Sequence, residues 1–173
     1  MIEQEDFLKK YLSARRSIGR YAKQKHNDTG IKRKFTGEPY WEHPKSVSKV
    51  LAVFGAPERL IRAGFCHDLI EDAGVTWDDL YDESDSDIAD IVSELTNDKE
   101  DLKKLGKEVY MNDKLIHLSS DALTIKLADN YCNLNDRPTE DQRKRILNNV
   151  RFLKRNRKLN KIQKELVNAI LNR

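Results

Sequence analysis

Residues 63–72 read Ala-Gly-Phe-Cys-His-Asp-Leu-Ile-Glu-Asp, so four ionisable side chains occupy the last six positions of an otherwise apolar stretch. Upstream, Leu60 and Ile61 extend the apolar pattern at a spacing typical of the buried face of a helix. Charged and polar groups are rarely buried without partners. The stretch therefore predicts a core helix, running from Pro57 to near Gly74, that carries a functional site.

The ionisable side chains of this helix recur at helical spacing. With about 3.6 residues per turn, His67 and Glu71 share one face, and Asp68 and Asp72 share another. One turn can then present an imidazole and up to three carboxylates toward a common point. Carboxylates at such short distances repel one another unless a cation lies between them, so the spacing indicates a metal site.

Two other polar residues interrupt predicted helices and could complete such a site. His43 precedes Pro44 at the expected start of a helix, and Asp129 lies within the apolar run of residues 123–129. Two imidazoles and two carboxylates form a donor set of intermediate hardness, suited to Mn, Fe or Zn with open positions for water and substrate. The absence of thiolate ligands disfavours a structural zinc.

Helical periodicity extends over most of the chain. An opening helix has one apolar stripe that includes Phe7, Ile18 and Tyr21, and residues 27–30 end it. Thr76 and Asp79 have the spacing of an N-terminal capping box. Further helices are expected over residues 44–55, 57–74, 77–82, 85–97, 99–114 and 121–134, with two more in the tail. Because no useful alternating strand pattern occurs, the predicted fold class is all-α.

Length and composition favour a single folded domain. The chain has 173 residues, of which 38% are hydrophobic and 35% charged, enough for one apolar core. No run approaches the roughly 20 apolar residues of a membrane span, and the acidic start is unlike a secretory signal. We therefore expect a cytoplasmic protein without membrane association. Cys66 and Cys132 lack a paired spacing, which predicts reduced thiols.

Charge is distributed unevenly along the chain. Residues 137–173 contain twelve Lys or Arg and three acidic residues, a net charge of +9 that leaves −6 for the remainder. Such a basic segment can attract an anionic partner such as a nucleotide or a nucleic acid. It can equally form a solvated helix surface, and composition alone leaves both interpretations open.

Three segments resemble a known enzyme family. They are Arg-Lys-Phe-Thr-Gly-Glu-Pro-Tyr-Trp-Glu-His-Pro at 33–44, His-Asp-Leu-Ile-Glu-Asp-Ala-Gly-Val-Thr at 67–76, and Lys-Leu-Ala-Asp-Asn-Tyr-Cys-Asn-Leu at 126–134. In this order they are similar to the HD-domain phosphohydrolases, specifically the SpoT-type branch that hydrolyses the alarmone (p)ppGpp. The length resembles that of the small stand-alone members, the metazoan SpoT homologues.

The resemblance implies an all-α helical bundle in which residues 1–173 form a single HD phosphohydrolase domain. Its motifs would lie within about 18–136 and its basic C-terminal helices within about 137–173. The implied reaction removes pyrophosphate from the 3′ position of (p)ppGpp, a guanine nucleotide, to give GDP or GTP. The implied ligands of one Mn²⁺ ion are His43, His67, Asp68 and Asp129. The implied catalytic carboxylates are Glu71 and Asp72, and the implied substrate contacts are Arg33, Lys34, Asn133 and Lys99.

Departures from the family pattern keep an alternative substrate open. Many relatives carry basic or hydroxyl residues at the positions of Asn130, Cys132, Asn135 and Asp136. The alternative is an HD phosphohydrolase that acts on another nucleotide, such as NADPH at its 2′-phosphate or a nucleoside polyphosphate. A non-catalytic nucleic-acid-binding protein is a third reading, which the intact ligand set disfavours.

Three polar residues outside the proposed ligand set are expected to have structural roles. His26 is expected to cap a helix or lie at the surface, and His117 to lie in a loop. Lys126 could contact a phosphate group or extend its aliphatic stem along the helix surface, and the second role is expected.

Overall fold

The computed structural model describes the backbone of residues 2–34 and 36–173, and side chains from residue 5 onward within those ranges. The regular structure of these residues is helical, apart from one isolated antiparallel bridge between Lys32 and Pro39. The predicted all-α fold class is therefore confirmed. No described helix is both long enough and apolar enough to cross a membrane. The chain divides into two compact units, Met1–Thr96 and Asn97–Arg173.

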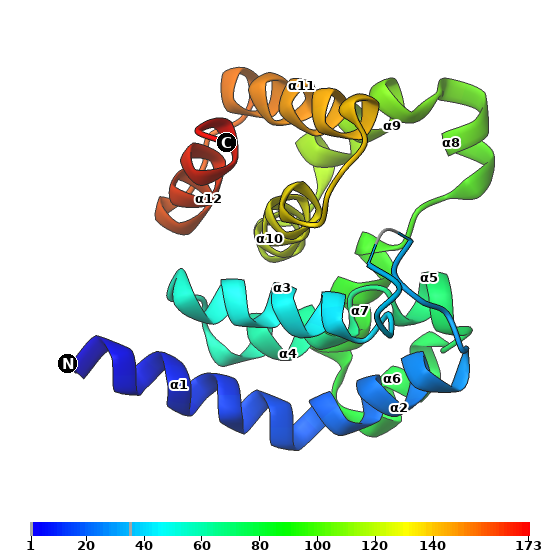
Figure 1. Ribbon diagram of the computed structural model, residues 1–173, viewed down its shortest axis with the longest axis vertical. Helices are drawn as coiled ribbons and strands as arrows, with labels where there is room; N and C mark the ends of the chain where they lie inside the picture. Colours follow the sequence, from blue (N-terminus) through cyan, green and yellow to red (C-terminus); the bar gives the residue numbers. More distant parts are fainter. Residues whose placement is uncertain (1, 35) are drawn as a thin grey trace. The chain divides into compact units, whose positions relative to one another are not determined.

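The first unit consists of α-helices that cover the N-terminal half of the chain (Figure 1). A π-helical turn, η1, connects α1 to α2, so the predicted opening helix is one helical path with a local change of hydrogen bonding. The elements are α1 (Ile2–Ala14), η1 (Arg15–Gly19), α2 (Arg20–Asp28), α3 (Glu42–Val53), α4 (Glu58–Cys66), α5 (Leu69–Ala73), α6 (Trp77–Glu83) and α7 (Ser86–Leu95).

Close packing of α3 on α4 forms the centre of this unit. Gly64 allows the approach, because a Cβ atom there would lie 2.7 Å from Cδ1 of Leu51. Phe65 is fully buried, and the ring of Trp41 stacks on it with 5.5 Å between centroids. His43, at the start of α3, and His67, just after α4, are thereby held by the best-packed pair of helices in the unit.

Two helices predicted to be continuous are interrupted. The helix expected over 57–74 breaks at His67 and Asp68, where α4 ends and α5 has yet to begin. The helix expected over 99–114 breaks at Gly106, whose φ of +79° is a conformation that favours glycine. Apolar periodicity continues across both breaks, so it did not reveal them. The capping box of Thr76 and Asp79 is confirmed at the start of α6.

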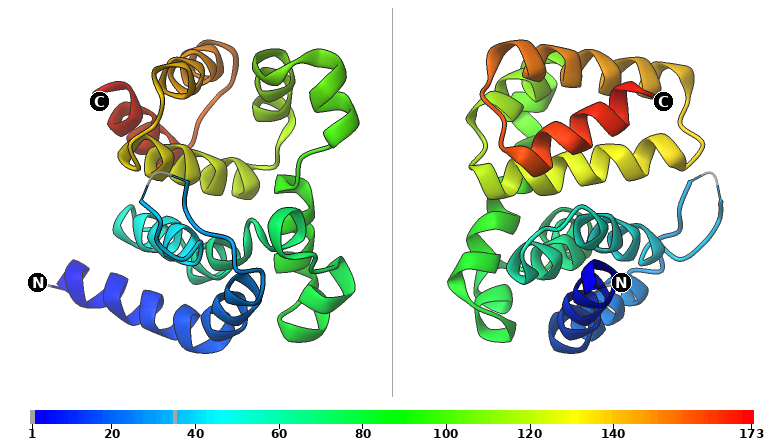
Figure 2. Two further views of the ribbon diagram at one scale, coloured as in Figure 1. Left: turned by 45° about the vertical axis from the view of Figure 1, so that its right-hand side comes forward. Right: turned by 90° about the vertical axis from the view of Figure 1, so that its left-hand side faces the viewer.

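The second unit contains five helices within the described residues 97–173 (Figure 2). Helix α10 packs on α12, and α11 packs on both α9 and α12. Leu123, Ile125 and Leu127 of α10 are fully buried, as are Leu153 of α11 and Leu166 of α12. The elements are α8 (Lys99–Leu105), α9 (Lys107–His117), α10 (Ser120–Asn135), α11 (Glu140–Asn156) and α12 (Lys161–Leu171).

The expected positions of two histidines are corrected. His26 is buried, with 1% of its surface exposed, and its ring lies 5.2 Å from the ring of Tyr40. Its Nε2 makes no hydrogen bond with the part of the protein that the structure describes. Burial disfavours the charged imidazolium and lowers the pKa of His26 to about 4. His117 is the last residue of α9 rather than part of a loop.

Burial of His26 predicts an acid-dependent loss of stability. Its pKa is about 4 in the folded protein and about 6.5 when unfolded, so below pH 6.5 the unfolded chain binds a proton that the folded chain does not. We expect the unfolding free energy of metal-free protein to fall by up to about 3 kcal/mol between pH 6.5 and 4 from this group. Urea denaturation across this range should show a smaller fall for His26→Gln. Parallel curves for the two proteins would contradict the assignment.

Candidate functional site

The interruption between α4 and α5 shapes the candidate site in the first unit. Asp68 lies just before α5 with φ −105° and ψ 2°, outside regular helix geometry, and its carbonyl accepts a 2.8 Å hydrogen bond from the N–H of Asp72. His67 Nδ1 is 2.9 Å from the carbonyl oxygen of Gly64. The turn therefore fixes the imidazole from one side and starts the short helix that carries Glu71 and Asp72.

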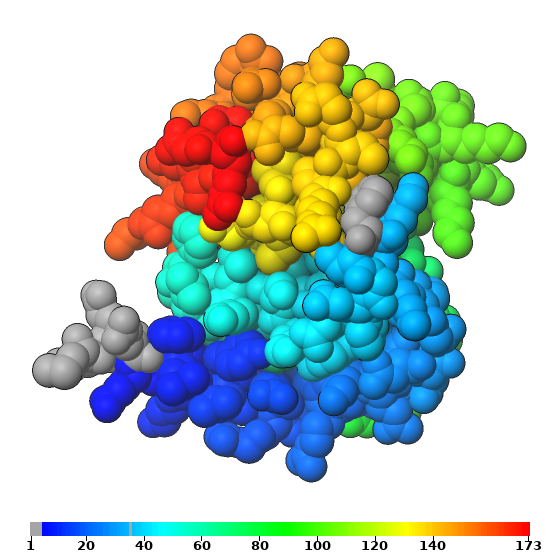
Figure 3. Space-filling view, viewed as in Figure 1, coloured from blue at the N-terminus to red at the C-terminus, as the bar shows by residue number. Residues whose placement is uncertain are grey.

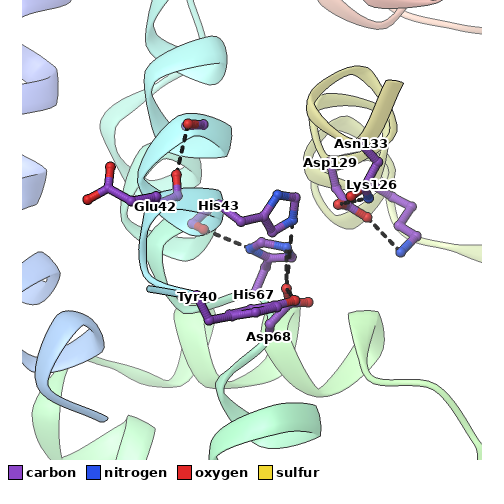
Figure 4. Close-up of polar contacts among 10 residues, drawn as sticks. Tyr40, Glu42, His43, His67, Asp68, Lys126, Asp129 and Asn133 are labelled. Atoms are coloured by element: carbon purple, nitrogen blue, oxygen red, sulfur yellow. Dashed lines mark hydrogen bonds and ion pairs between the residues drawn. The ribbon is translucent and has the colours of Figure 1, made fainter. Parts of the chain in front are cut away.

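Three of the four predicted metal ligands meet in this unit (Figure 4). His67 Nε2 lies 3.1 Å from Asp68 Oδ2, and His43 Nε2 lies 3.8 Å from the same oxygen. The two imidazole rings are 5.3 Å apart between centroids. Both histidines are buried, so little water can screen the groups.

The protonation pattern of this cluster fits a cation. A carbonyl oxygen can only accept, so Nδ1 of His67 carries the proton that is donated to Gly64. If the imidazole is neutral, its Nε2 then has a lone pair and accepts hydrogen bonds. This nitrogen faces Oδ2 of Asp68, which is also a hydrogen-bond acceptor. Two acceptors this close repel unless a proton or a metal ion lies between them. Imidazole and carboxylate are ligands of divalent transition metals, so the donor set suits such an ion.

Tyr40 is a member of the cluster that the sequence analysis did not single out. Its hydroxyl donates a 2.7 Å hydrogen bond to Asp68 Oδ2, and a second side-chain interaction of Tyr40 lowers the pKa of Asp72. The guanidinium carbon of Arg33 lies 5.6 Å from the centre of the Tyr40 ring. Tyr40 thus joins a predicted ligand, a predicted catalytic carboxylate and a predicted substrate contact. Its place in the Pro-Tyr segment before His43 was the available signal.

Asp72 has an environment that makes it a better base than an exposed aspartate. Burial raises the pKa of Asp72, the negative charge of Asp68 raises it further, and the hydrogen bond with Tyr40 opposes the rise. A carboxylate with a raised pKa takes a proton more readily near neutral pH. Glu71 precedes it on α5 and is half-buried.

Asp129, the fourth predicted ligand, belongs to α10 of the second unit and is buried there. Lys126 Nζ lies 2.8 Å from its Oδ2, and Asn133 Nδ2 donates a 2.6 Å hydrogen bond to its Oδ1. Figure 4 shows the three side chains together on one helix. The ammonium group of Lys126 thus turns toward Asp129 and balances its charge, a contact that the sequence did not predict. Asn133 is fixed one helical turn after Asp129.

A cavity of about 290 Å³ opens beside Asp129 within the second unit. Three cationic side chains line it, and neither Lys107 nor Arg145 was among the predicted site residues. Lys99 is exposed and does not line the cavity. The lining residues are Asn97, Leu102, Lys107, Met111, Lys126, Asp129, Asn130, Asn133, Gln142, Arg145, Ile146 and Asn149.

Arg33 and Lys34 lie in the loop between α2 and α3, in the first unit. The N–H of Arg33 donates to the carbonyl of Glu38 at 2.8 Å, and its own carbonyl accepts from the N–H of Gly37 at 3.0 Å. These bonds fold the loop back on itself. Arg33 is thereby kept beside Tyr40, while Lys34 is exposed.

Known proteins resemble this chain at the level of both sequence and structure. A zebrafish protein named guanosine-3′,5′-bis(diphosphate) 3′-pyrophosphohydrolase MESH1 is 33% identical over 119 residues, which are 68% of this chain and 62% of that protein. The protein of the same name from Xenopus tropicalis is 32% identical over 100 residues, covering 57% and 55%. The match thus spans less than two thirds of either relative.

A solved structure, described as a metazoan ortholog of SpoT that hydrolyzes ppGpp and plays a role in starvation responses, is similar over 94% of both chains. Its TM-score is 0.74 and its sequence identity 26%. The HD domain family matches residues 19–151, a range that includes all three motifs identified in the sequence. The chain belongs to the HD domain family.

Proposed function

We propose that the protein is a metal-dependent phosphohydrolase that removes the 3′-pyrophosphate of (p)ppGpp, giving GDP or GTP and pyrophosphate. The cluster of Asp68 with the buried His43 and His67 carries this proposal, because its facing acceptors suit a metal ion. The resemblance to relatives named as 3′-pyrophosphohydrolases supports the choice of substrate. The proposed location is the cytoplasm, in keeping with Cys66 and Cys132, which are buried and form no disulfide within the described residues.

The proposed metal site uses the four ligands that the motifs imply, and residues 1–173 are proposed to act as one HD phosphohydrolase domain. His43, His67 and Asp68 would supply ligands from the first unit, and Asp129 would supply the fourth from the second unit. We propose Mn²⁺ as the ion, because a mixed imidazole and carboxylate set of intermediate hardness suits it. When bound, such an ion supplies a Lewis acid that lowers the pKa of water and polarises a phosphoryl oxygen.

The residues around the cluster would handle protons and phosphate charge. Asp72, with its raised pKa, and the adjacent Glu71 would orient the attacking water and accept its proton. Water would then attack phosphorus, and the bond to the 3′ oxygen would break to release pyrophosphate. The 3′ oxygen would take up the proton removed from the water and become the hydroxyl of GDP or GTP.

Cationic side chains in both units would bind the nucleotide. Arg33 and Lys34 of the loop, and Lys99 of α8, are the contacts proposed from the sequence. Lys107, Lys126 and Arg145 line the cavity beside Asp129, where their positive charge would bind phosphate groups. Asn133 presents an amide in the same cavity and would reach the ribose or the base.

A second candidate substrate follows from the lining of this cavity. Asn130, one of the departures from the family pattern, lines it, and so does Asn149. The Asn149 amide donates to Asn112 Oδ1 at 2.6 Å and to the carbonyl of Glu108 at 3.2 Å. An amide at Asn130, where many relatives carry a basic or hydroxyl residue, favours a different nucleotide specificity, and the candidate is the 2′-phosphate of NADPH.

Product analysis distinguishes the two substrates. We expect purified protein with Mn²⁺ to convert ppGpp to GDP and pyrophosphate, and EDTA to stop the reaction because the metal is removed. Anion-exchange chromatography would identify the guanine product, and a phosphate assay would follow NADPH in parallel. Release of phosphate from NADPH with ppGpp left intact would refute the alarmone proposal and support the second candidate.

Substitutions within the cluster should separate metal binding from catalysis. Asp68→Asn removes a ligand charge, so we expect loss of both bound Mn²⁺ and turnover. Glu71→Gln keeps the ligands, so we expect stoichiometric metal with turnover reduced by about 100-fold or more. Metal analysis after gel filtration and the product assay provide the two readouts. Asp78→Asn, on the exposed face of α6, is the control for a lost carboxylate charge. Full metal content in Asp68→Asn would contradict the assignment of that ligand.

Tyr40 is proposed to position the cluster. Its hydroxyl holds Asp68 Oδ2 at 2.7 Å and influences Asp72, so Tyr40→Phe would free both carboxylates while keeping the ring beside Arg33. We expect weaker Mn²⁺ binding and a kcat lower by about 10-fold, with KM changed less. Titrating activity with Mn²⁺ would measure both effects, and Tyr81→Phe on exposed α6 is the control. An unchanged Mn²⁺ dependence would rule out this role.

A further inference from the structure

A second cavity, of about 440 Å³, lies in the second unit where α11 ends and α12 begins. It shares no lining residue with the cavity beside Asp129. In Figure 3 the two helices appear in orange and red on the viewer's side of the surface. The lining residues are Lys154, Arg157, Lys158, Leu159, Lys164, Val167 and Asn168.

The charge of this cavity is positive and uncompensated. Four of its seven lining residues are Lys or Arg, and none is acidic. Lys154, Lys158 and Lys164 are exposed, and their side chains form no hydrogen bond or ion pair with the described residues 5–34 and 36–173. Cations gathered around one cavity repel one another, and an anion bound among them would relieve that repulsion.

Arg157 gives the cavity a fixed element. Its Nη1 donates to the carbonyl oxygens of Leu115 and Ile116, at 2.8 and 3.0 Å, so the guanidinium is held against the end of α9. Five N–H groups are available on a guanidinium, and these two bonds leave donors for a ligand. A held cation loses less conformational entropy on binding an anion than a free lysine does.

The start of α12 adds to the positive potential. A helix N-terminus carries a partial positive charge that acidic residues usually balance. The first turn of α12 contains no acidic residue and begins with Lys161, while Lys158 precedes it and Lys164 follows one turn later. This arrangement opposes the usual preference and costs stability unless a bound anion offsets it.

We propose that this cavity is a second anion site, which binds the polyphosphate group of a small ligand. Its volume lies in the range of small-molecule pockets, rather than of an extended surface that follows a polymer. The floor of Leu159 and Val167 is buried and apolar, so binding would rest on the charged rim. The ligand is a linear polyphosphate, either free or carried by a nucleoside. The site goes beyond the proposed hydrolysis, because it uses none of the residues placed there.

A titration followed by ¹H–¹⁵N NMR tests the proposal on the whole chain. The probes are inorganic tripolyphosphate and ATP, added in EDTA so that no metal intervenes. We expect saturable shifts for backbone amides of residues 154–168. The double variant Lys158→Glu/Lys164→Glu should weaken binding by about 10-fold or more, because two attractive charges become repulsive. If tripolyphosphate and ATP bind with equal affinity, the ligand is a free polyphosphate. If ATP binds more tightly, the ligand is a nucleotide.

A charge-matched variant distinguishes binding at this cavity from non-specific attraction of anions by the positive charge of the tail. Lys104→Glu/Lys144→Glu makes the same change of net charge at exposed residues outside the cavity, and it should bind the probes like the original protein. An equal loss of probe affinity in both double variants would overturn the proposal. Amide chemical-shift changes confined to residues 126–149 would also overturn it. If single-stranded RNA displaces the probes and binds more tightly than either, with amide shifts along all of α11 and α12, the surface binds nucleic acid instead. Lys158→Ala/Lys164→Ala, checked by circular dichroism, repeats the test if the Glu variant does not fold.

Discussion

A half-buried carboxylate oxygen that faces two buried imidazole nitrogens is the constraint on which the candidate site depends. Asp68 Oδ2 lies 3.1 Å from His67 Nε2 and 3.8 Å from His43 Nε2. The carbonyl of Gly64 fixes the proton of His67 on the opposite nitrogen. Such an arrangement is unfavourable in an apolar setting unless positive charge enters it. The packing of α3 on α4 holds the histidines in place, so the fold maintains a cluster of acceptors that suits a proton or a metal ion.

The second unit also buries a carboxylate, that of Asp129, and balances it with side chains of the same helix. Asp129 is buried in α10, and Lys126 and Asn133 of the same helix engage its two oxygens. The carboxylate is thus satisfied by neighbours one turn away, which also fixes its direction. In the proposed enzyme Lys126 would serve twice, because it balances Asp129 and lines the cavity that would bind phosphate groups.

The basic tail contributes to packing and to two proposed anion-binding cavities, which its composition could not separate. Arg145 of α11 lines the cavity beside Asp129, whereas Lys154, Lys158 and Lys164 surround the cavity at the start of α12. Arg157 is occupied in part by the carbonyls at the end of α9 and thereby connects α11 to α9. Positive charge in this tail is therefore divided among packing, the proposed substrate pocket and the proposed second anion site.

The fold class, the positions of most helices and the motif residues could be predicted from the amino-acid sequence alone. Apolar periodicity is a local property, since residues three and four apart share a helix face. The same signal could not locate the breaks at His67 and Gly106, because apolar residues continue across them. It also missed the burial of His26 and the contact of Tyr40 with Asp68, which join segments 28 residues apart. Only tertiary packing brings such segments together, so the network around Asp68 and the lining of both cavities were decided there.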